Sequence, residues 1–253
     1  MKKIAFIFEG ETEQIFYFHL LDFFAQKYNM QREEVRDQSE IYHLLGENII
    51  IKHWTVGTIT QVPTSGRWFN RFCVSKNDSR DWIVFLCYDT DEYKNDITKF
   101  DSDDWSELRK NLGDALVIDI AAAADIEDVM LTDFDGVSRY MGLNPSFTLA
   151  DFPGRKGKVK MKAIGRCGKP YHEGIRAKPL IEALDMQKII DSHIVIVCYC
   201  ASTQVRVMCM LLSRRLIPLL AMRKCALKST LDFPSENKEG LWTIRLIYQF
   251  IFR

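Results

Sequence analysis

A short apolar run, Lys3-Ile4-Ala5-Phe6-Ile7-Phe8, leads directly into Glu9-Gly10-Glu11-Thr12-Glu13. A second apolar run, Trp82 to Tyr88, leads into Asp89-Thr90-Asp91-Glu92. Apolar runs of this length are typical of strands that are covered on both faces, as in a parallel sheet. Ligands of open α/β sheets bind beyond the carboxyl ends of such strands. Two buried strands that end in carboxylates therefore predict an oxygen-lined site suited to a divalent cation such as Mg²⁺.

The following segments alternate between helix and strand patterns. Thr12 is expected to cap a helix that runs to about Tyr28, and Asp104-Trp105-Ser106-Glu107 has the chemistry of a capping box. Further strands are expected at Ile49 to Val56 and at Ala115 to Ile120, with a loop that enters a helix between them. This alternation predicts an α/β fold, in which helices flank a mostly parallel, Rossmann-like sheet.

Charge is distributed unevenly along the 253 residues, although the formal net charge is zero. Residues 192–253 hold nine Lys or Arg and three Asp or Glu, a net charge of +6, so residues 1–191 carry −6. An acidic body argues against general coating of DNA, but metal-dependent nucleases offset their carboxylates with bound cations. We expect a catalytic core at 1–135, a basic segment and helix at 136–191 that complete it, and a basic, apolar tail at 192–253. We expect the tail either to form a final strand and a basic helix or to be unrelated to the rest of the chain, for example through an altered reading frame. We assign it no catalytic role.

Cysteine usage and hydropathy bear on the compartment. The seven cysteines show no repeated pair spacing, which is typical of reduced thiols in a cytosolic protein. The first apolar run is short and followed by acidic residues, unlike a signal peptide. Arg206, Arg214 and Arg215 interrupt the most hydrophobic region, Ile194 to Met222, which argues against a membrane span. We therefore expect a cytoplasmic protein without a membrane partner.

The order of the acidic motifs resembles that of the toprim domain, which topoisomerases, primases and nucleases of the overcoming-lysogeny-defect type share. The resemblance lies in Glu9-Gly10 after the first strand and Asp89-Thr90-Asp91 after a later one, and covers roughly residues 1–190. Glu9-Gly10-Glu11-Thr12-Glu13 is most similar to the stand-alone toprim nucleases of bacterial anti-phage and abortive-infection systems. Asp125-Ile126-Glu127-Asp128 resembles the acidic helix that follows the Asp-x-Asp strand in such proteins.

The resemblance implies a Mg²⁺-dependent (or Mn²⁺-dependent) endonuclease that cleaves DNA or tRNA. Glu9 would be a metal ligand or a general acid or base, Asp89 and Asp91 metal ligands, and Glu13 and Glu127 supports for a second ion. In-line phosphodiester cleavage accumulates negative charge that one or two such ions can stabilise. The implied role is an effector of anti-phage defence, held in check by a separate ATPase, and the chain contains no Walker A motif of its own. A homodimer is a further expected option.

Two other functions stay open from the sequence. One is a non-catalytic, toprim-like subunit that binds nucleic acid within a defence complex. The other is a protein related to the toprim primases and topoisomerases, although no zinc module or active-site tyrosine context is visible.

A basic segment, Gly154 to Lys169, contains no acidic residue. The alternation of Lys158, Lys160 and Lys162 predicts either a strand with one cationic face or a helix that pairs Lys158 with Lys162. By resemblance, a basic residue here would hold the scissile phosphate; Lys160 is our catalytic candidate, with Lys162 as the alternative. The residues expected to contact nucleic acid are Lys156, Lys158, Lys160, Lys162, Arg176 and Lys178.

Each of these features also has an ordinary structural explanation. Acidic residues after strands often cap helices or face solvent. Glu127 and Asp128, near the start of a helix, are also favoured by the helix dipole. A run of lysines is commonly a solvated face.

Overall fold

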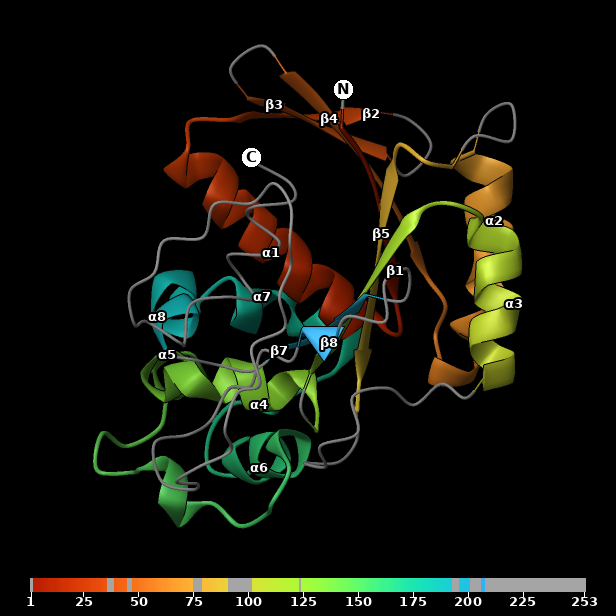
Figure 1. The fold of residues 1–253 in the computed structure, drawn as a ribbon. Coiled ribbons are helices and arrows are strands. Elements are labelled where there is room, and N and C mark those ends of the chain that lie inside the picture. The colour runs from red at the N-terminus through yellow and green to blue at the C-terminus, as the bar shows by residue number, and fades with distance from the viewer. Residues whose placement is uncertain are drawn as a thin grey trace, which may run out of the picture.

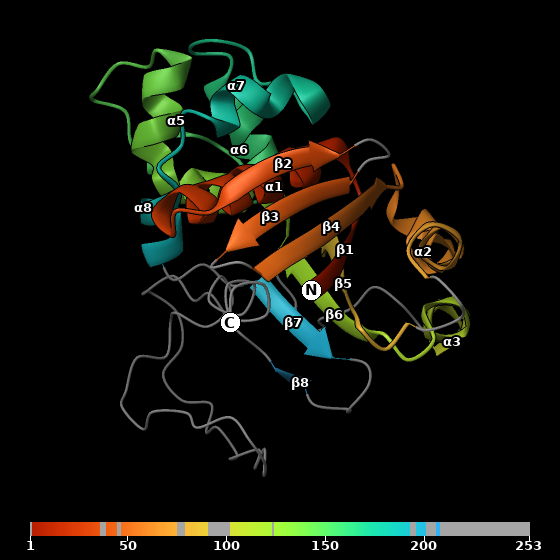
Figure 2. The same ribbon diagram turned by 90° about the horizontal axis from the view of Figure 1, so that it is seen from above.

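The computed structural model of the chain describes residues 2–35, 39–44, 47–74, 79–90, 102–122, 124–192, 196–200 and 206–207. In this part of the chain, eight strands form one sheet in the order β2-β3-β4-β1-β5-β6-β7-β8. Helices cover both faces of the sheet (Figure 1), and the view from above shows α2 and α3 on the side opposite α1 (Figure 2). No helix within the described ranges is long and apolar enough to cross a bilayer.

The centre of the sheet is parallel. Its strands are β4 (Glu47–Thr55), β1 (Lys2–Phe8), β5 (Trp82–Asp89) and β6 (Leu116–Ala122). Antiparallel strands extend it on both sides: β2 (Gln31–Val35) and β3 (Ser39–Leu44) beside β4, and β7 (Ile196–Cys200) and β8 (Arg206–Val207) beside β6. The predicted α/β class, with a mostly parallel, Rossmann-like sheet between helices, is confirmed. The strands at 31–44 were not predicted, because the polar sequence of β2 lacks an apolar run.

Strand β1 divides the core into two parts because successive side chains point to opposite faces. Ile4, Phe6 and Phe8 pack on one face, and Ala5 and Ile7 on the other; all five are fully buried. The first face is covered by α1 (Glu11–Lys27), α4 (Ile126–Met130), α5 (Phe134–Met141), α6 (Gly157–Ile164), α7 (Lys178–Ile181) and α8 (Met186–Asp191). The second face is covered by α2 (Gly66–Phe72) and α3 (Ser102–Leu112).

Two expected helix caps are wrong. Helix α1 begins at Glu11, with Gly10 as its N-cap, so Thr12 lies inside the first turn. The Thr12 hydroxyl instead accepts a hydrogen bond from the Gly174 amide, 2.8 Å away, a contact that sequence spacing could not indicate. Helix α3 begins at Ser102, which places Asp104 within its first turn rather than at the N-cap.

Helices α4 and α6 are joined end to end by two carboxylates. Asp125 caps α4 by accepting from the Asp128 amide at 3.1 Å, and it also accepts from the Lys158 amide at 3.1 Å. Asp128 accepts from the Gly157 amide at 2.9 Å. These bonds satisfy amides at the starts of both helices, which otherwise lack intrahelical partners. The contact requires glycine at position 157, where a Cβ atom would lie only 2.2 Å from the Asp128 amide nitrogen.

We therefore expect Gly157→Ala to lower the free energy of unfolding by about 1–3 kcal/mol, because overpacking forces the two helices apart. Val159→Ala in the same helix is the control: its side chain is half exposed, and it should change stability by no more than about 0.5 kcal/mol. Urea denaturation followed by circular dichroism measures both variants. Equal stability of Gly157→Ala and the unmodified protein would contradict the close approach of α4 and α6.

Candidate active site

Carboxylates gather at the carboxyl edge of the parallel strands. Glu9 directly follows β1, Asp89 is the last residue of β5, and Asp125 and Glu127 follow β6. Because β1, β5 and β6 are adjacent and parallel, these residues share one edge of the sheet (Figure 1). Glu13 joins them from the first turn of α1. The structure thus brings together four of the five predicted acidic residues, and Asp91 lies outside the described residues.

Mutual repulsion and burial act on these carboxyl groups. Burial raises the pKa of Asp89 well above its ordinary value, and the charges of Glu13, Glu127, Glu9 and Asp125 raise it further. Burial, together with Glu9 and Glu127, raises the pKa of Glu13 to about 7. Burial also raises the pKa of Glu127, against the hydrogen bond from Tyr171. Among the described residues, positive charge therefore offsets these carboxylates only in part.

The donor atoms fit a hard divalent cation. Asp89 Oδ1 is buried without a hydrogen-bond partner among the described residues, and the amide of Asp89 donates to Glu9 Oε2 at 3.1 Å. Hard cations such as Mg²⁺ prefer carboxylate oxygens and neutralise the charge that burial makes unfavourable. Within the described ranges, however, no three His, Cys, Asp or Glu side chains form a ready coordination group.

The loops at this edge are held by Thr90. Its hydroxyl donates to the Ala122 carbonyl at 3.1 Å and accepts from the Ala124 amide at 2.9 Å, which ties the end of β5 to the end of β6. Ala124 has a φ of +67°, a left-handed conformation that is unfavourable for a residue with a Cβ atom. Such strain persists where surrounding contacts fix it, and it is frequent at functional sites.

The basic segment forms a helix, so the helical alternative for Lys158 to Lys162 is confirmed and the strand alternative is wrong. Lys158 and Lys162 both pair with Glu173, at 2.6 and 3.1 Å. Burial lowers the pKa of Lys158, but the hydrogen bond to Glu173 and the charges of Glu127, Glu173 and Asp89 raise it overall. Lys160 lies about 200° around the helix axis from Lys158. Lys158 is therefore the lysine of α6 whose charge acts on the carboxylates.

The other predicted nucleic-acid contacts lie on or beside three helical elements. Lys156 is the N-cap of α6. Arg176 is exposed in the 3₁₀ helix Gly174–Ala177, and Lys178 at the start of α7 is exposed and pairs with Glu182 at 3.7 Å.

Residues 171–175, here called the covering loop, contact the site. No sequence motif indicated these contacts. The Tyr171 hydroxyl donates to Glu127 Oε1 at 2.5 Å, and Glu173 holds the two lysines. The Gly174 amide donates to Thr12, and the Ile175 amide donates to Glu11 Oε2 at 3.1 Å. The partners of Tyr171, Gly174 and Ile175 are 44 to 164 residues away in the chain, and those of Glu173 lie in the preceding helix. Sequence reasoning therefore missed Tyr171 and Glu173.

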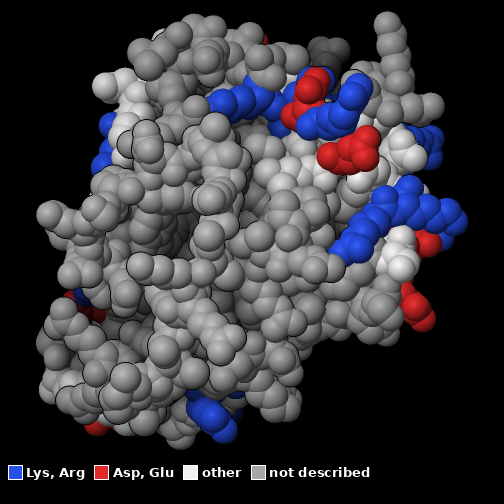
Figure 3. All heavy atoms as spheres, viewed as in Figure 1, with Lys and Arg blue, Asp and Glu red and all other residues white. Residues whose placement is uncertain are grey.

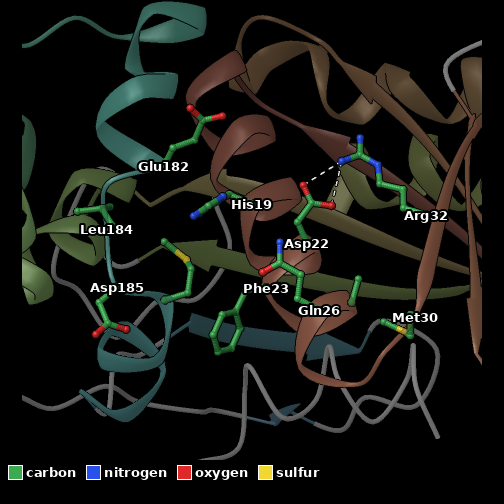
Figure 4. Close-up of a pocket in the computed structure, with 11 residues that line it drawn as sticks. His19, Asp22, Phe23, Gln26, Met30, Arg32, Glu182, Leu184 and Asp185 are labelled. Carbon is green, nitrogen blue, oxygen red and sulfur yellow. Dashed lines mark hydrogen bonds and ion pairs between the residues drawn. The ribbon is translucent and has the colours of Figure 1, made fainter.

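A separate cavity of about 590 Å³ lies along the later turns of α1. His19 and Asp22 line it from α1, with Arg32 from β2 and Glu182 and Asp185 from the segment around α7 and α8 (Figure 4). Arg32 donates to both carboxylate oxygens of Asp22 at 2.9 Å, so these two charges neutralise each other. None of the predicted site residues lines this cavity.

The raised pKa of Glu13 gives a testable dependence of stability on pH. Its folded value of about 7 exceeds the ordinary 4.5, so the folded state binds more protons between these values and stability falls as pH rises through this window. Glu13→Gln should remove part of this fall and, in EDTA, stabilise the protein above neutral pH by up to about 3 kcal/mol. Below about pH 4.5 the two proteins should be equally stable.

Urea unfolding across this pH range measures the effect. Glu182→Gln, an exposed glutamate, is the control and should leave the slope unchanged. If Glu13→Gln also leaves the slope unchanged, Glu13 does not share the buried charge of the cluster.

No protein-family model matches this chain, and no curated protein sequence matches it. The comparisons therefore add no relative whose activity would bear on the site.

Proposed function

We propose that the protein is a toprim-type endonuclease that hydrolyses phosphodiester bonds with Mg²⁺ or Mn²⁺. The observation that supports this most is the set of carboxylates that follow three adjacent parallel strands, including a buried Asp89 oxygen without a described partner. Structural acidic residues at such positions would be expected to cap helices or face solvent. Asp125 does cap a helix, whereas Glu13 and Glu127 are buried and repel their neighbours.

The proposed roles follow from position. Glu9 and Asp89, with Asp91, would hold the cation, and Glu13 and Glu127 would support a second one. A bound cation at such a site supplies charge stabilisation for the phosphoryl oxygens and lowers the pKa of a coordinated water. Lys158 interacts electrostatically with Glu127 and Asp89, so we propose that Lys158, rather than the expected Lys160, would bind a phosphate oxygen. Tyr171 would orient Glu127 through its hydrogen bond.

The biological setting is proposed from the motif resemblance alone. Glu9-Gly10-Glu11-Thr12-Glu13 is similar to the stand-alone nucleases of anti-phage defence. We accordingly propose a cytoplasmic effector that acts on DNA or tRNA together with a separate ATPase. A non-catalytic subunit that binds nucleic acid is the alternative that the following experiment distinguishes.

Glu9→Gln and Asp89→Asn should each reduce Mg²⁺-dependent cleavage of labelled DNA and tRNA by at least about 100-fold, because each removes a charge from the reacting centre. Both variants should stay folded, since they also remove repulsion between buried carboxylates. Asp81→Asn is the control: Asp81 directly precedes β5 and is exposed at the opposite edge of the sheet. Full cleavage by Glu9→Gln and Asp89→Asn would refute the nuclease, and binding without cleavage by the unmodified protein would favour the alternative.

Glu173 forms ion pairs with Lys158, the proposed phosphate ligand, and with Lys162. Glu173→Gln should therefore raise the affinity for nucleic acid about two- to fivefold, in line with the small energies of exposed ion pairs. Fluorescence anisotropy in EDTA measures binding without cleavage. Glu182→Gln removes an equivalent charge from a pair with Lys178 and should have a smaller effect. An equal gain in both variants would mean that overall charge, not Glu173, limits binding.

A further inference from the structure

A row of aromatic rings lies on the face of the sheet opposite α1. Trp54 on β4 stacks on Trp68 of α2 with ring centroids 6.0 Å apart, and Trp68 contacts Phe72 at 6.5 Å. Within the described part of the chain, Trp54 and Phe72 are among the few large apolar side chains that stay exposed, at 38% and 52%. Exposing large rings to water is unfavourable, and adjacent exposed rings often mark a surface that binds another molecule.

The row is held rigidly in place. The Lys52 ammonium donates to the Phe72 carbonyl at 2.5 Å, which anchors the end of α2 to β4. The Arg71 guanidinium lies 5.1 Å from the centre of the Phe72 ring. The backbone at the end of α2 is thus tied to the sheet, which limits the conformational entropy lost on binding.

The segment that carries the row is basic. Residues 48–74 contain no Asp or Glu, in a chain that has 34 of them, but contain Lys52, Arg67 and Arg71. Arg67 pairs with Glu107 of α3 at 3.2 Å, whereas Arg71 has no acidic partner among the described residues. In Figure 3, basic side chains lie among acidic ones on the side where Figure 1 draws α2 and α3. Of the two helices on this side, α3 carries acidic residues in its first turn and α2 carries none.

The row begins next to the candidate active site. Trp54 is paired in register with Ile7 of β1, two residues before Glu9. Beyond Trp54, the Gly57 amide donates to the Glu9 carbonyl at 2.8 Å. From this point, Trp68 and Phe72 continue the row along α2. A chain molecule lying on the rings would therefore have one end near Glu9.

We propose that Trp54, Trp68 and Phe72 form a stacking platform for single-stranded nucleic acid that leads one strand toward the carboxylates. Aromatic rings stack on bases of any sequence, and cations between them contact the phosphates, which together is how single strands are bound without sequence preference. Bases in a duplex are already stacked and cannot reach the rings. This inference rests on the proposed nuclease function, for which the platform would select single-stranded substrate.

The experiment measures binding of the full-length protein to a labelled oligothymidylate, an oligouridylate and a blunt DNA duplex in EDTA. Trp54→Ala and Phe72→Ala should each weaken binding of both single strands by about tenfold or more, because one base stack is lost. Trp54→Phe keeps a ring and should retain most of the affinity. Binding of the duplex should be unaffected. Phe147→Ala is the matched control, since Phe147 is 38% exposed like Trp54 but packs on Phe152, away from the row.

Two further readouts separate stacking from a general loss of charge or fold. Oligothymidylate should quench the tryptophan fluorescence of the unmodified protein, and Trp54→Ala should lose much of that quenching. Arg71→Gln should reduce the slope of log affinity against log salt by about 0.7, the value for one phosphate contact on a single strand. Circular dichroism should show all variants folded.

Absence of single-strand binding by the unmodified protein would overturn the platform, as would unchanged binding by Trp54→Ala and Phe72→Ala or an equal loss in Phe147→Ala. A change of oligomeric state in the aromatic variants, without a loss of single-strand affinity, would assign the row to a protein interface instead. The nuclease is tested separately. If the unmodified protein cleaves nucleic acid and the aromatic variants bind single strands as well as it does, only the platform is refuted. If single-strand binding depends on the rings but no cleavage occurs, only the nuclease is refuted.

Discussion

Parallel pairing of β1 between β4 and β5 is the constraint on which the rest of the structure depends. Helices cover both faces of β1, and Ile4 to Phe8 are fully buried. The register that pairs Phe8 with Cys87 leaves the ends of β1 and β5 side by side. Glu9 and Asp89 are therefore neighbours because of backbone pairing, before any side-chain interaction is considered. The same pairing carries the residues after β6 to this edge.

The fold accepts an electrostatic cost at that edge. Buried carboxylates repel one another, and their raised pKa values indicate that ionisation works against folding there. Partial compensation comes from Lys158 and from the Tyr171 hydroxyl. The charge of another buried carboxylate, Asp133, is compensated. Asp133 accepts from two backbone amides and from Lys188, and these contacts together lower its pKa despite burial. The contrast is what distinguishes the edge carboxylates from structural ones.

The sequence was sufficient to predict the features that depend on local pattern. Apolar runs located β1, β4, β5 and β6, and periodicity located α1 to within two residues at its start and one at its end. The positions of Glu9 and Asp89 followed, because parallel strands end at a common edge. The polar β2, the helical state of Lys158 to Lys162 and the cap of α1 were missed or left open, since each is decided by tertiary packing rather than by its own residues. The assembly of Glu9 and Asp89 with Asp91 stays a prediction.

Contacts distant in sequence complete the site, and they explain why local patterns could not reveal it. Lys158, Tyr171 and Glu173 all follow the β-strands that carry the carboxylates, and they reach the site through the junction of α4 with α6 and the bonds of the covering loop to Thr12 and Glu11. Helix α6 is thereby oriented by the acidic residues Asp125 and Asp128, next to the carboxylates on which its lysine acts. The segment Asp125 to Asp128 thus fixes the position of α6 and also adds negative charge, which Lys158 of α6 offsets. Residues 136–191 are consequently part of the site itself, and the positive charge of Lys158 is positioned by the packing of these late helices on the sheet.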